Sequence, residues 1–254
     1  SGGDYGTSLD IDRAVVLVDG ALRSTNARAV NLTFQKVAPS RPSLKNLQIL
    51  LQQTIELAGF DGLVEIFLLD LQTRQELSFA YQNGENLPSG IAFTAASTMK
   101  IPIMVSVFKR TSEPTPEGIQ QMLELMIERS ENDPADRMME TVMDKNLGPL
   151  QVTDDLQAMG FQNTFLAGYF YPGAPLLRRY VTPANSRTDI NTQPDAYNQT
   201  TPQEIAMLLD DIQLCADSGG GTMTAVFPGE VTQKECQTMI DLLSKNRIGV
   251  LAQS

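Results

Sequence analysis

The sequence contains no histidine among its 254 residues. Histidine is the usual base for serine and cysteine nucleophiles, a common metal ligand and the side chain best suited to acid–base catalysis near neutral pH. Its absence excludes Ser-His-Asp and Cys-His catalytic sites as well as histidine metal sites. Any hydrolytic chemistry must therefore use serine, lysine, tyrosine or carboxylate groups.

Long apolar runs and positive charge are also scarce. No apolar stretch approaches the roughly eighteen residues of a membrane-spanning helix, so we expect no membrane span in this chain. The 19 lysines and arginines are outnumbered by 30 acidic residues, which gives a net charge of −11. Nucleic acids and anionic membrane surfaces bind basic patches, and the sequence has no basic run. The composition therefore argues against a nucleic-acid partner.

Cysteine is the third scarce residue type, with Cys215 and Cys236 alone. They flank a glycine-rich loop between two predicted helices, and their spacing matches no metal-binding pattern. A disulfide in an oxidising compartment would suit this placement, and two buried unpaired thiols are the alternative. Neither alternative involves a metal, so we predict no cofactor.

Residues 1–42 differ in character from the rest of the chain. An apolar periodic segment at residues 11–22 precedes an alternating stretch at residues 29–34, which predicts a strand. Two prolines at residues 39–42 then indicate a linker. The segment resembles the end of the small modules of the peptidoglycan-binding type that precede cell-wall enzymes. A structural N-terminal leader is the plainer interpretation.

Residues 43–254 have the pattern of a mixed α+β domain. Ser43 can cap a helix that Gly59 ends, and two strands follow at residues 63–69 and 76–81. A helix preceding an antiparallel hairpin is typical of the α+β class.

After Lys109 the sequence is mostly helical. An irregular stretch at residues 161–199 interrupts the helices, and loops of this length inside a domain are usually functional. We predict helices that start near Pro116, Pro134, Pro149, Thr201 and Thr232.

The most informative stretch is residues 93–104, where a polar run passes into an apolar helix. Ser97 and Lys100 are three residues apart, so on a helix they share one face and can touch. At the start of a helix, the unpaired N–H groups and the dipole favour a serine oxyanion and disfavour a charged lysine. A lysine held partly neutral there could take the proton of the serine.

The same spacing recurs at Ser106 and Lys109. We expect S-x-x-K by chance about once in a chain of this length, so the spacing alone does not indicate a site. The second pair lies nearly three turns into the same helix, away from terminal N–H groups. The simplest interpretation is that this spacing arises by chance on one face of the helix. For Ser97 and Lys100, the corresponding alternative is a helix start with a solvated lysine.

The turn Ser130-Glu131-Asn132 lies between two predicted helices. Its hydroxyl could relay a proton, and its amide could orient a substrate. An ordinary helix-capping turn is the alternative.

The order of these motifs resembles that of the class A β-lactamases and related serine D,D-peptidases, the penicillin-interacting serine hydrolases. In that family an S-x-x-K opens a central buried helix, an S-D-N turn follows a helical pair, and a T-T-P begins a later helix. This chain has the matching segments at residues 97–100, 130–132 and 200–202. The resemblance spans residues 45–254 and implies a helical subdomain packed on an antiparallel sheet.

The resemblance also implies a role for each residue. Ser97 would be acylated by a β-lactam or a D-alanyl amide, with Lys100 as its base. Ser130 would relay the proton to the leaving nitrogen, Asn132 would hold the amide side chain of the substrate, and water would release the acyl group. The partner would be a small-molecule β-lactam or a peptidoglycan stem peptide, and the location would be extracytoplasmic in a bacterium.

Two departures from the family pattern concern the site. Glu131 replaces the usual aspartate, which we expect to reposition the turn. Residues 141–203 contain no glutamate, although class A β-lactamases use one there to activate the deacylating water. Matching residues 189–191 to the family loop places Arg187 at the glutamate position. Asp189 is then the nearest carboxylate, and we predict it on the substrate side, with loop bracing as the alternative.

A third departure concerns the C-terminal end. Beyond the equivalent of Leu251 the family continues into a strand with a K-S/T-G motif, which supplies a cation for the substrate carboxylate and an oxyanion N–H. The sequence given ends at Ser254, so we expect these C-terminal strands to be missing from this chain. The lack of a loop glutamate favours a penicillin-binding D,D-peptidase as an alternative function. The lack of the strand favours a non-catalytic cell-wall-binding domain that keeps the fold.

Overall fold

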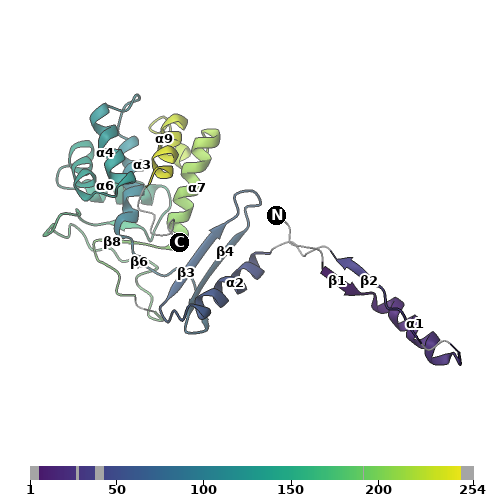
Figure 1. Ribbon diagram of the computed structural model, residues 1–254. Coiled ribbons are helices and arrows are strands. Elements are labelled where there is room, and N and C mark those ends of the chain that lie inside the picture. The colour runs from purple at the N-terminus through teal and green to yellow at the C-terminus, as the bar shows by residue number, and fades with distance from the viewer. Residues whose placement is uncertain (1–5, 27–28, 38–42, 191, 247–254) are drawn as a thin grey trace. The chain divides into compact units, whose positions relative to one another are not determined.

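The structure is a computed structural model that describes residues 6–26, 29–37, 43–190 and 192–246 (Figure 1). Its contacts divide the chain into two compact units, Ser1–Gln53 and Thr54–Ser254. The predicted linker at residues 39–42 and the segment after residue 246 lie outside the described residues. The roles predicted for residues 1–42 and 43–254 stay predictions.

The first unit contains a small β-α-β arrangement, followed by residues 44–53 of the next helix. Strand β1 (Gly6–Leu9) pairs antiparallel with β2 (Phe34–Val37), and helix α1 (Ile11–Arg23) connects them. Asp10 caps α1 by accepting a hydrogen bond from the Arg13 backbone N–H at 3.1 Å, and it accepts another from the Gln35 side chain at 2.8 Å. The strand predicted at residues 29–34 is wrong by several positions, because the partner strand β1 pairs only with residues 34–37.

Helix α2 (Leu44–Leu57) begins and ends as its sequence predicts. The Ser43 hydroxyl accepts a hydrogen bond from the Asn46 backbone N–H at 3.1 Å, and Gly59 follows the helix with a left-handed φ of 64°. A hydroxyl cap accepts a hydrogen bond from an otherwise unpaired N–H group at the start of a helix. A glycine after the last turn adopts the left-handed conformation in which helices commonly end.

A three-stranded antiparallel sheet follows, in the order β3 (Val64–Leu69), β4 (Glu76–Gln82) and β5 (Glu85–Leu87). The sequence predicts β3 and β4 but ends the hairpin at the turn of Asn83 and Gly84. Both turn residues have positive φ, which suits a tight hairpin, and the chain turns back to add β5.

Helix α3 (Lys100–Phe108) is the centre of the helical part of the second unit. It contacts α4 (Glu117–Glu128), α5 (Asn132–Met138), α6 (Gly148–Ala158) and α9 (Gln233–Ser244). Of these, α4, α6 and α9 are labelled around α3 in Figure 1. All its residues except Ile101 are buried. This burial also removes the first residue of α3, Lys100, from contact with solvent.

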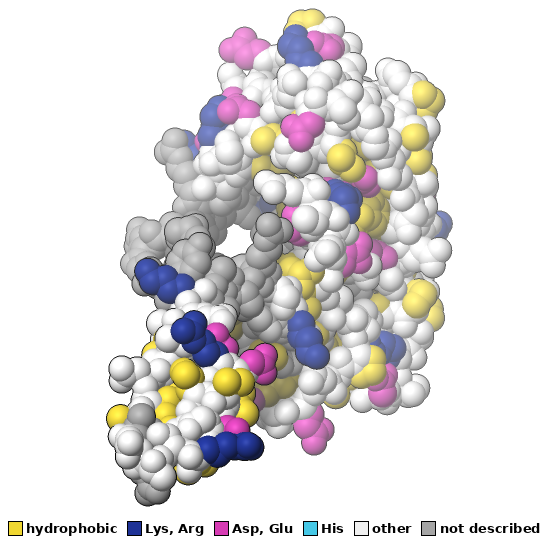
Figure 2. All heavy atoms as spheres, turned by 90° about the vertical axis from the view of Figure 1, so that its right-hand side faces the viewer, with side chains coloured by type: hydrophobic (Ala, Val, Ile, Leu, Met, Phe, Trp, Pro, Cys, Tyr) yellow, Lys and Arg dark blue, Asp and Glu magenta, His cyan; other side chains and the backbone are white. Residues whose placement is uncertain are grey.

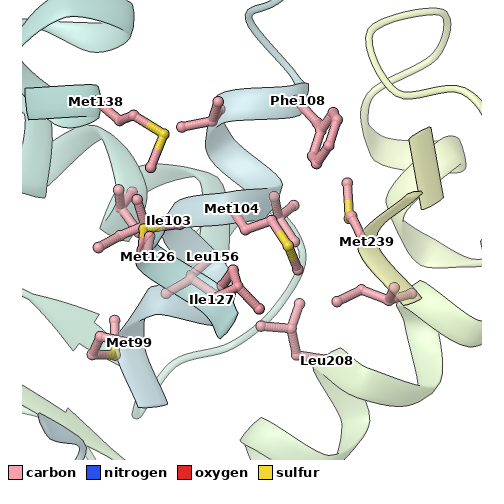
Figure 3. Close-up of a cluster of buried hydrophobic side chains, with 14 of the residues drawn as sticks. Met99, Ile103, Met104, Phe108, Met126, Ile127, Met138, Leu156, Leu208 and Met239 are labelled. Atoms are coloured by element: carbon pink, nitrogen blue, oxygen red, sulfur yellow. The ribbon is translucent and has the colours of Figure 1, made fainter. Parts of the chain in front are cut away.

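Methionine and branched aliphatic side chains fill the core around α3 (Figure 3). Ile103 lies beside Met126, while Met104 faces Leu208 and Met239 on the other side of the helix. Flexible methionine side chains fill irregular gaps between helices, which matches their predicted role as core residues.

A second small sheet joins the long irregular stretch to the start of the S-x-x-K segment. Its order is β6 (Phe93–Thr94), β8 (Asn198–Thr200) and β7 (Phe165–Leu166), all antiparallel. The sequence did not predict β7 and β8, because strands of two or three residues carry no measurable periodicity. Through β8, they join residues 165–166 to residues 93–94, which lie just before the S-x-x-K segment.

The C-terminal helices complete the second unit. Thr201 caps α7 (Pro202–Ser218), and a reciprocal capping box of Thr232 and Glu235 starts α9. A short helix that the sequence did not predict, α8 (Thr222–Val226), lies between them, and Cys215 and Cys236 form a disulfide that joins α7 to α9. The predicted α+β fold class is confirmed.

Charged side chains are dispersed over the face drawn in Figure 2. On the face drawn in Figure 2, lysines and arginines of the described residues lie in small separate groups, many beside acidic side chains. No helix among the described residues is long and apolar enough to cross a membrane.

Candidate active site

A strained backbone turn presents Ser97. The short 3-10 turn η1 (Ala96–Met99) precedes α3, and Ala96 has a left-handed φ of 47° that is costly for a residue with a Cβ. The Ala96 backbone N–H donates to Oδ1 of Asn198 at 2.6 Å, and Asn198 is buried on β8. This bond stabilises the turn, which leaves Ser97 exposed although α3 behind it is buried.

Lys100 lies beneath Ser97 and is only 2% exposed. Its Nζ is 3.1 Å from the Ser97 hydroxyl oxygen, 3.0 Å from that of Ser130 and 2.8 Å from Oδ1 of Asn132. Burial lowers the pKa of Lys100, and the negative charge of Asp136 partly opposes this. Lys100 therefore loses its proton more readily than an exposed lysine does, and the resulting neutral amine can accept a proton.

The turn between α4 and α5 brings Ser130 to Lys100. Ser130 has a left-handed φ of 58°, and both its carbonyl and its hydroxyl oxygen accept hydrogen bonds from Lys100. The next residue, Glu131, is exposed, and its backbone N–H donates to the Leu125 carbonyl at 3.2 Å. The structure thus brings the predicted residues Ser97, Lys100, Ser130 and Asn132 together, while their catalytic roles stay predictions.

A cavity of about 250 Å³ opens beside these residues. One side is formed by Ser97, Lys100 and Ser130, and the remaining lining comes mainly from η1, α3, α4 and the end of α9. These further lining residues are Thr98, Ile101, Met126, Ile127, Leu243 and Asn246. The cavity thus combines an apolar wall with the polar Ser-Lys-Ser group, a composition suited to a small organic substrate.

Comparison with known proteins gives similarity in structure only. No family model and no curated protein matches the sequence. A β-lactamase from Desulfarculus baarsii has a TM-score of 0.52 at 15% identity, over 82% of this chain and 72% of that one. A β-lactamase from Xanthomonas campestris pv. campestris has a TM-score of 0.51 at 14% identity, over 82% and 72% of the two chains. An ancestral class A β-lactamase has a TM-score of 0.48 at 19% identity, over 82% and 73%.

The chain has part of the β-lactamase fold. At these identities the similarity concerns the fold alone, so the chemistry of the chain depends on its own residues. Within this β-lactamase fold, Lys100 and Ser97 occupy the start of the central helix, as the family resemblance predicts.

The second S-x-x-K pair has a structural role. Ser106 is buried within α3, and Nζ of Lys109 lies 2.7 Å from an Asp155 carboxylate oxygen and 3.9 Å from the ring centre of Phe227. Arg110 donates to the same carboxylate. Lys109 therefore belongs to a charge cluster between α3 and α6. This structural role agrees with the interpretation that the second S-x-x-K pair arises by chance.

Asp189 makes its described hydrogen bonds away from the Ser-Lys-Ser group. Its carboxylate accepts two hydrogen bonds from Arg187, whose guanidinium also donates to the carbonyls of Pro88 and Ser89. These contacts correspond to the loop-bracing alternative. The role of Asp189 on the substrate side stays a prediction, and Asn191 of the same matched segment lies outside the described residues.

The site includes two residues that the sequence does not predict, Asp136 and Phe170. Asp136 lies one helical turn after Asn132 on α5, is buried, and accepts a hydrogen bond from the Phe170 backbone N–H at 2.8 Å. Burial raises the pKa of Asp136, and the backbone N–H groups of Phe170 and Tyr171 oppose this. The spacing of Asn132 and Asp136 could have revealed the first residue, whereas no local pattern marks Phe170.

The described residues contain no group of three or more cysteine, aspartate or glutamate side chains that could hold a metal ion.

Proposed function

We propose that the chain is a serine hydrolase of the class A β-lactamase type, acylated at Ser97 by a β-lactam or a D-alanyl amide. The observation that carries this proposal is the position of the Lys100 amine, buried and within hydrogen-bond distance of both the Ser97 and the Ser130 hydroxyl oxygens. A buried lysine between two serine hydroxyls can move a proton from one to the other without histidine.

The reaction then proceeds by acyl transfer. Ser97 Oγ attacks the carbonyl carbon of the amide while its proton passes to the Lys100 amine. The backbone N–H of Ser97 supports the developing oxyanion, as helix-terminal N–H groups can. Ser130, in contact with Lys100, passes a proton to the leaving nitrogen as the C–N bond breaks. Asn132 orients the amide side chain of the substrate.

A penicillin-binding D,D-peptidase is the second candidate. It is favoured by the environment of Lys100, since no described carboxylate forms an ion pair with this lysine and an aromatic ring, Phe170, lies beside it. A site in which no described carboxylate contacts the lysine directly suits a protein that transfers or retains acyl groups. Release of D-alanine from a D-alanyl-D-alanine peptide, measured by chromatography, would distinguish this candidate from a β-lactamase.

The test is intact-mass spectrometry after incubation with a penicillin. We expect a mass increase of one whole penicillin molecule on the native protein and none on Ser97→Ala. Ser106→Ala is the matched control, since it removes the serine of the second S-x-x-K pair, and it should be labelled as the native protein is.

Two outcomes would contradict the proposal. One is a native protein that takes up no label, and the other is a label that survives Ser97→Ala. Binding of cell-wall fragments that is unaffected by Ser97→Ala, without any acylation, would instead support a non-catalytic cell-wall-binding domain.

The disulfide between Cys215 and Cys236 supports an extracytoplasmic location for this activity. Structural disulfides persist in oxidising compartments such as the periplasm and the cell surface. β-Lactams and peptidoglycan stem peptides are both met there, so the proposed location and the proposed substrates agree.

A further inference from the structure

Phe170 places its ring beside the Lys100 amine but does not belong to the lining of the cavity beside Ser97. Its ring centre lies 5.4 Å from Nζ, close enough for a cation–π contact. The ring is half-buried and packs against the hydrophobic core. The remaining described partners of Nζ are oxygens of Ser97, Ser130 and Asn132. On the side of the long loop, the amine therefore meets a hydrocarbon face.

The backbone of Phe170 is held firmly in this place. Asp136, buried on α5, accepts a hydrogen bond from its N–H at 2.8 Å. The hydroxyl of the preceding Tyr169 donates to the carbonyls of Asp144 and Lys145 at 3.0 Å. These bonds anchor Phe170 and the residue before it, which fixes the position of the ring beside the amine.

An acyl group on Ser97 leaves only when water attacks its ester carbonyl. The water oxygen bonds to the carbonyl carbon, the bond to Ser97 Oγ breaks, and one water proton ends on Oγ while the acid departs. Water is a weak nucleophile at neutral pH, so this step needs a base that holds and deprotonates it. Once the leaving nitrogen has received its proton, the neutral Lys100 amine is the base in contact with Ser97.

We propose that the Phe170 ring blocks the loop side of the Lys100 amine to the hydrolytic water, while the acyl group itself occupies the cavity beside Ser97, so that an acyl group on Ser97 is long-lived. An aromatic face offers no hydrogen-bonding group to fix such a water, and the other described neighbours of the amine are already oxygens of the site. The protein then binds a β-lactam as a persistent ester instead of turning it over rapidly. This inference rests on the proposed acylation of Ser97.

The test measures how long the ester persists. The native protein and its variants are labelled with a penicillin, excess drug is removed, and loss of the adduct is followed by intact mass. We expect Phe170→Ala to lose the adduct about tenfold faster or more, because water gains access to Lys100. Phe170→Glu adds a carboxylate base as well, and positioned bases contribute about 10²–10⁴-fold.

Tyr171→Ala is the matched control. Tyr171 is the next aromatic residue of the same segment, is 44% exposed, and stacks on Tyr169 instead of facing Lys100. Its adduct should decay as slowly as that of the native protein. Thermal melting of each variant shows whether the loop change has unfolded the domain, and the rate of labelling shows whether the Ser-Lys-Ser group is intact.

Different outcomes contradict the acylation of Ser97 and the role of Phe170. Native protein that is never labelled overturns the acylation of Ser97, and the inference with it. Two other outcomes overturn only the role of Phe170. One is a native adduct that is lost rapidly. The other is an adduct that forms normally but decays at the same rate in folded Phe170→Ala and in the native protein.

Discussion

At the scale of single residues, Lys100 has more hydrogen-bond acceptors than its ammonium group has donors. An ammonium has three N–H groups, whereas four oxygens of Ser97, Ser130 and Asn132 lie within reach of Nζ. All four are uncharged groups, so no described partner neutralises a positive charge by direct contact. Such a lysine is suited to exchanging a proton between the two serine hydroxyls.

The first prediction is that the rate of acylation rises with pH. The proposed reaction needs the neutral amine, and burial lowers the pKa of Lys100 from the ordinary value of 10.5. The rate should therefore increase as pH rises and level off above this lowered pKa. The measurement is the second-order rate constant of penicillin labelling over a series of pH values.

A second prediction concerns Asp136→Asn. The substitution keeps an oxygen that can accept the hydrogen bond from the Phe170 N–H, but it removes the negative charge that raises the pKa of Lys100. The pKa of Lys100 should fall further, and the rising limb of the pH profile should move to lower pH. Asp133→Asn, an exposed neighbour paired with Arg137, is the control. A limb that stays in place or moves to higher pH in Asp136→Asn would contradict this electrostatic role.

At the scale of elements, α3 serves both the site and the core. Its first residue, Lys100, belongs to the site, whereas the residues at its other end join the charge cluster of Lys109, Arg110 and Asp155. The side chain of Asp155 is only 5% exposed and forms ion pairs with both cations. The cluster therefore anchors α3 to α6.

The third prediction tests this anchor. Asp155→Ala leaves two partly buried cations without their shared carboxylate, and breaking such a buried pair costs about 3–5 kcal/mol. The free energy of unfolding, measured by denaturant titration, should fall by about this amount. Asp154→Ala, the exposed neighbour on the same helix, should change it little. Equal effects of the two substitutions would show that the cluster adds no stability.

The elements also show what the sequence can predict. Capping residues such as Ser43, Thr201 and Thr232 act locally, and the helices they begin start where the sequence predicts. Strands β5, β7 and β8 are too short for a periodic pattern, and β7 and β8 also depend on pairing between distant parts of the chain, so the sequence does not predict them. Within the site, spacing could predict the contact of Ser97 with Lys100. The position of Phe170 depends on a long loop and could not be predicted.

At the scale of the whole molecule, the disulfide joins two helices that border the core around α3. Cys215 and Cys236 are 21 positions apart, and neither lines the cavity beside Ser97. A cross-link stabilises mainly by restricting the unfolded chain. It should therefore affect stability without affecting the chemistry of the site.

The fourth prediction follows from this separation. Replacing both Cys215 and Cys236 by alanine should lower the free energy of unfolding by about 3 kcal/mol for a loop of this length. The rate of penicillin labelling at a temperature where the variant is folded should match that of the native protein. Adding a reductant should destabilise the native protein but not the variant. A variant as stable as the native protein would contradict the structural role of the disulfide.

The central claim is that Ser97 and its Lys100 partner carry an acyl-transfer site within a partial β-lactamase fold. The most direct measurement is peptide mapping of the penicillin-labelled protein by tandem mass spectrometry. Trypsin should release a peptide of residues 75–100 that carries the label, with fragment ions that place it on Ser97. A label on any other residue, including Ser106 in the peptide of residues 101–109, would contradict the account.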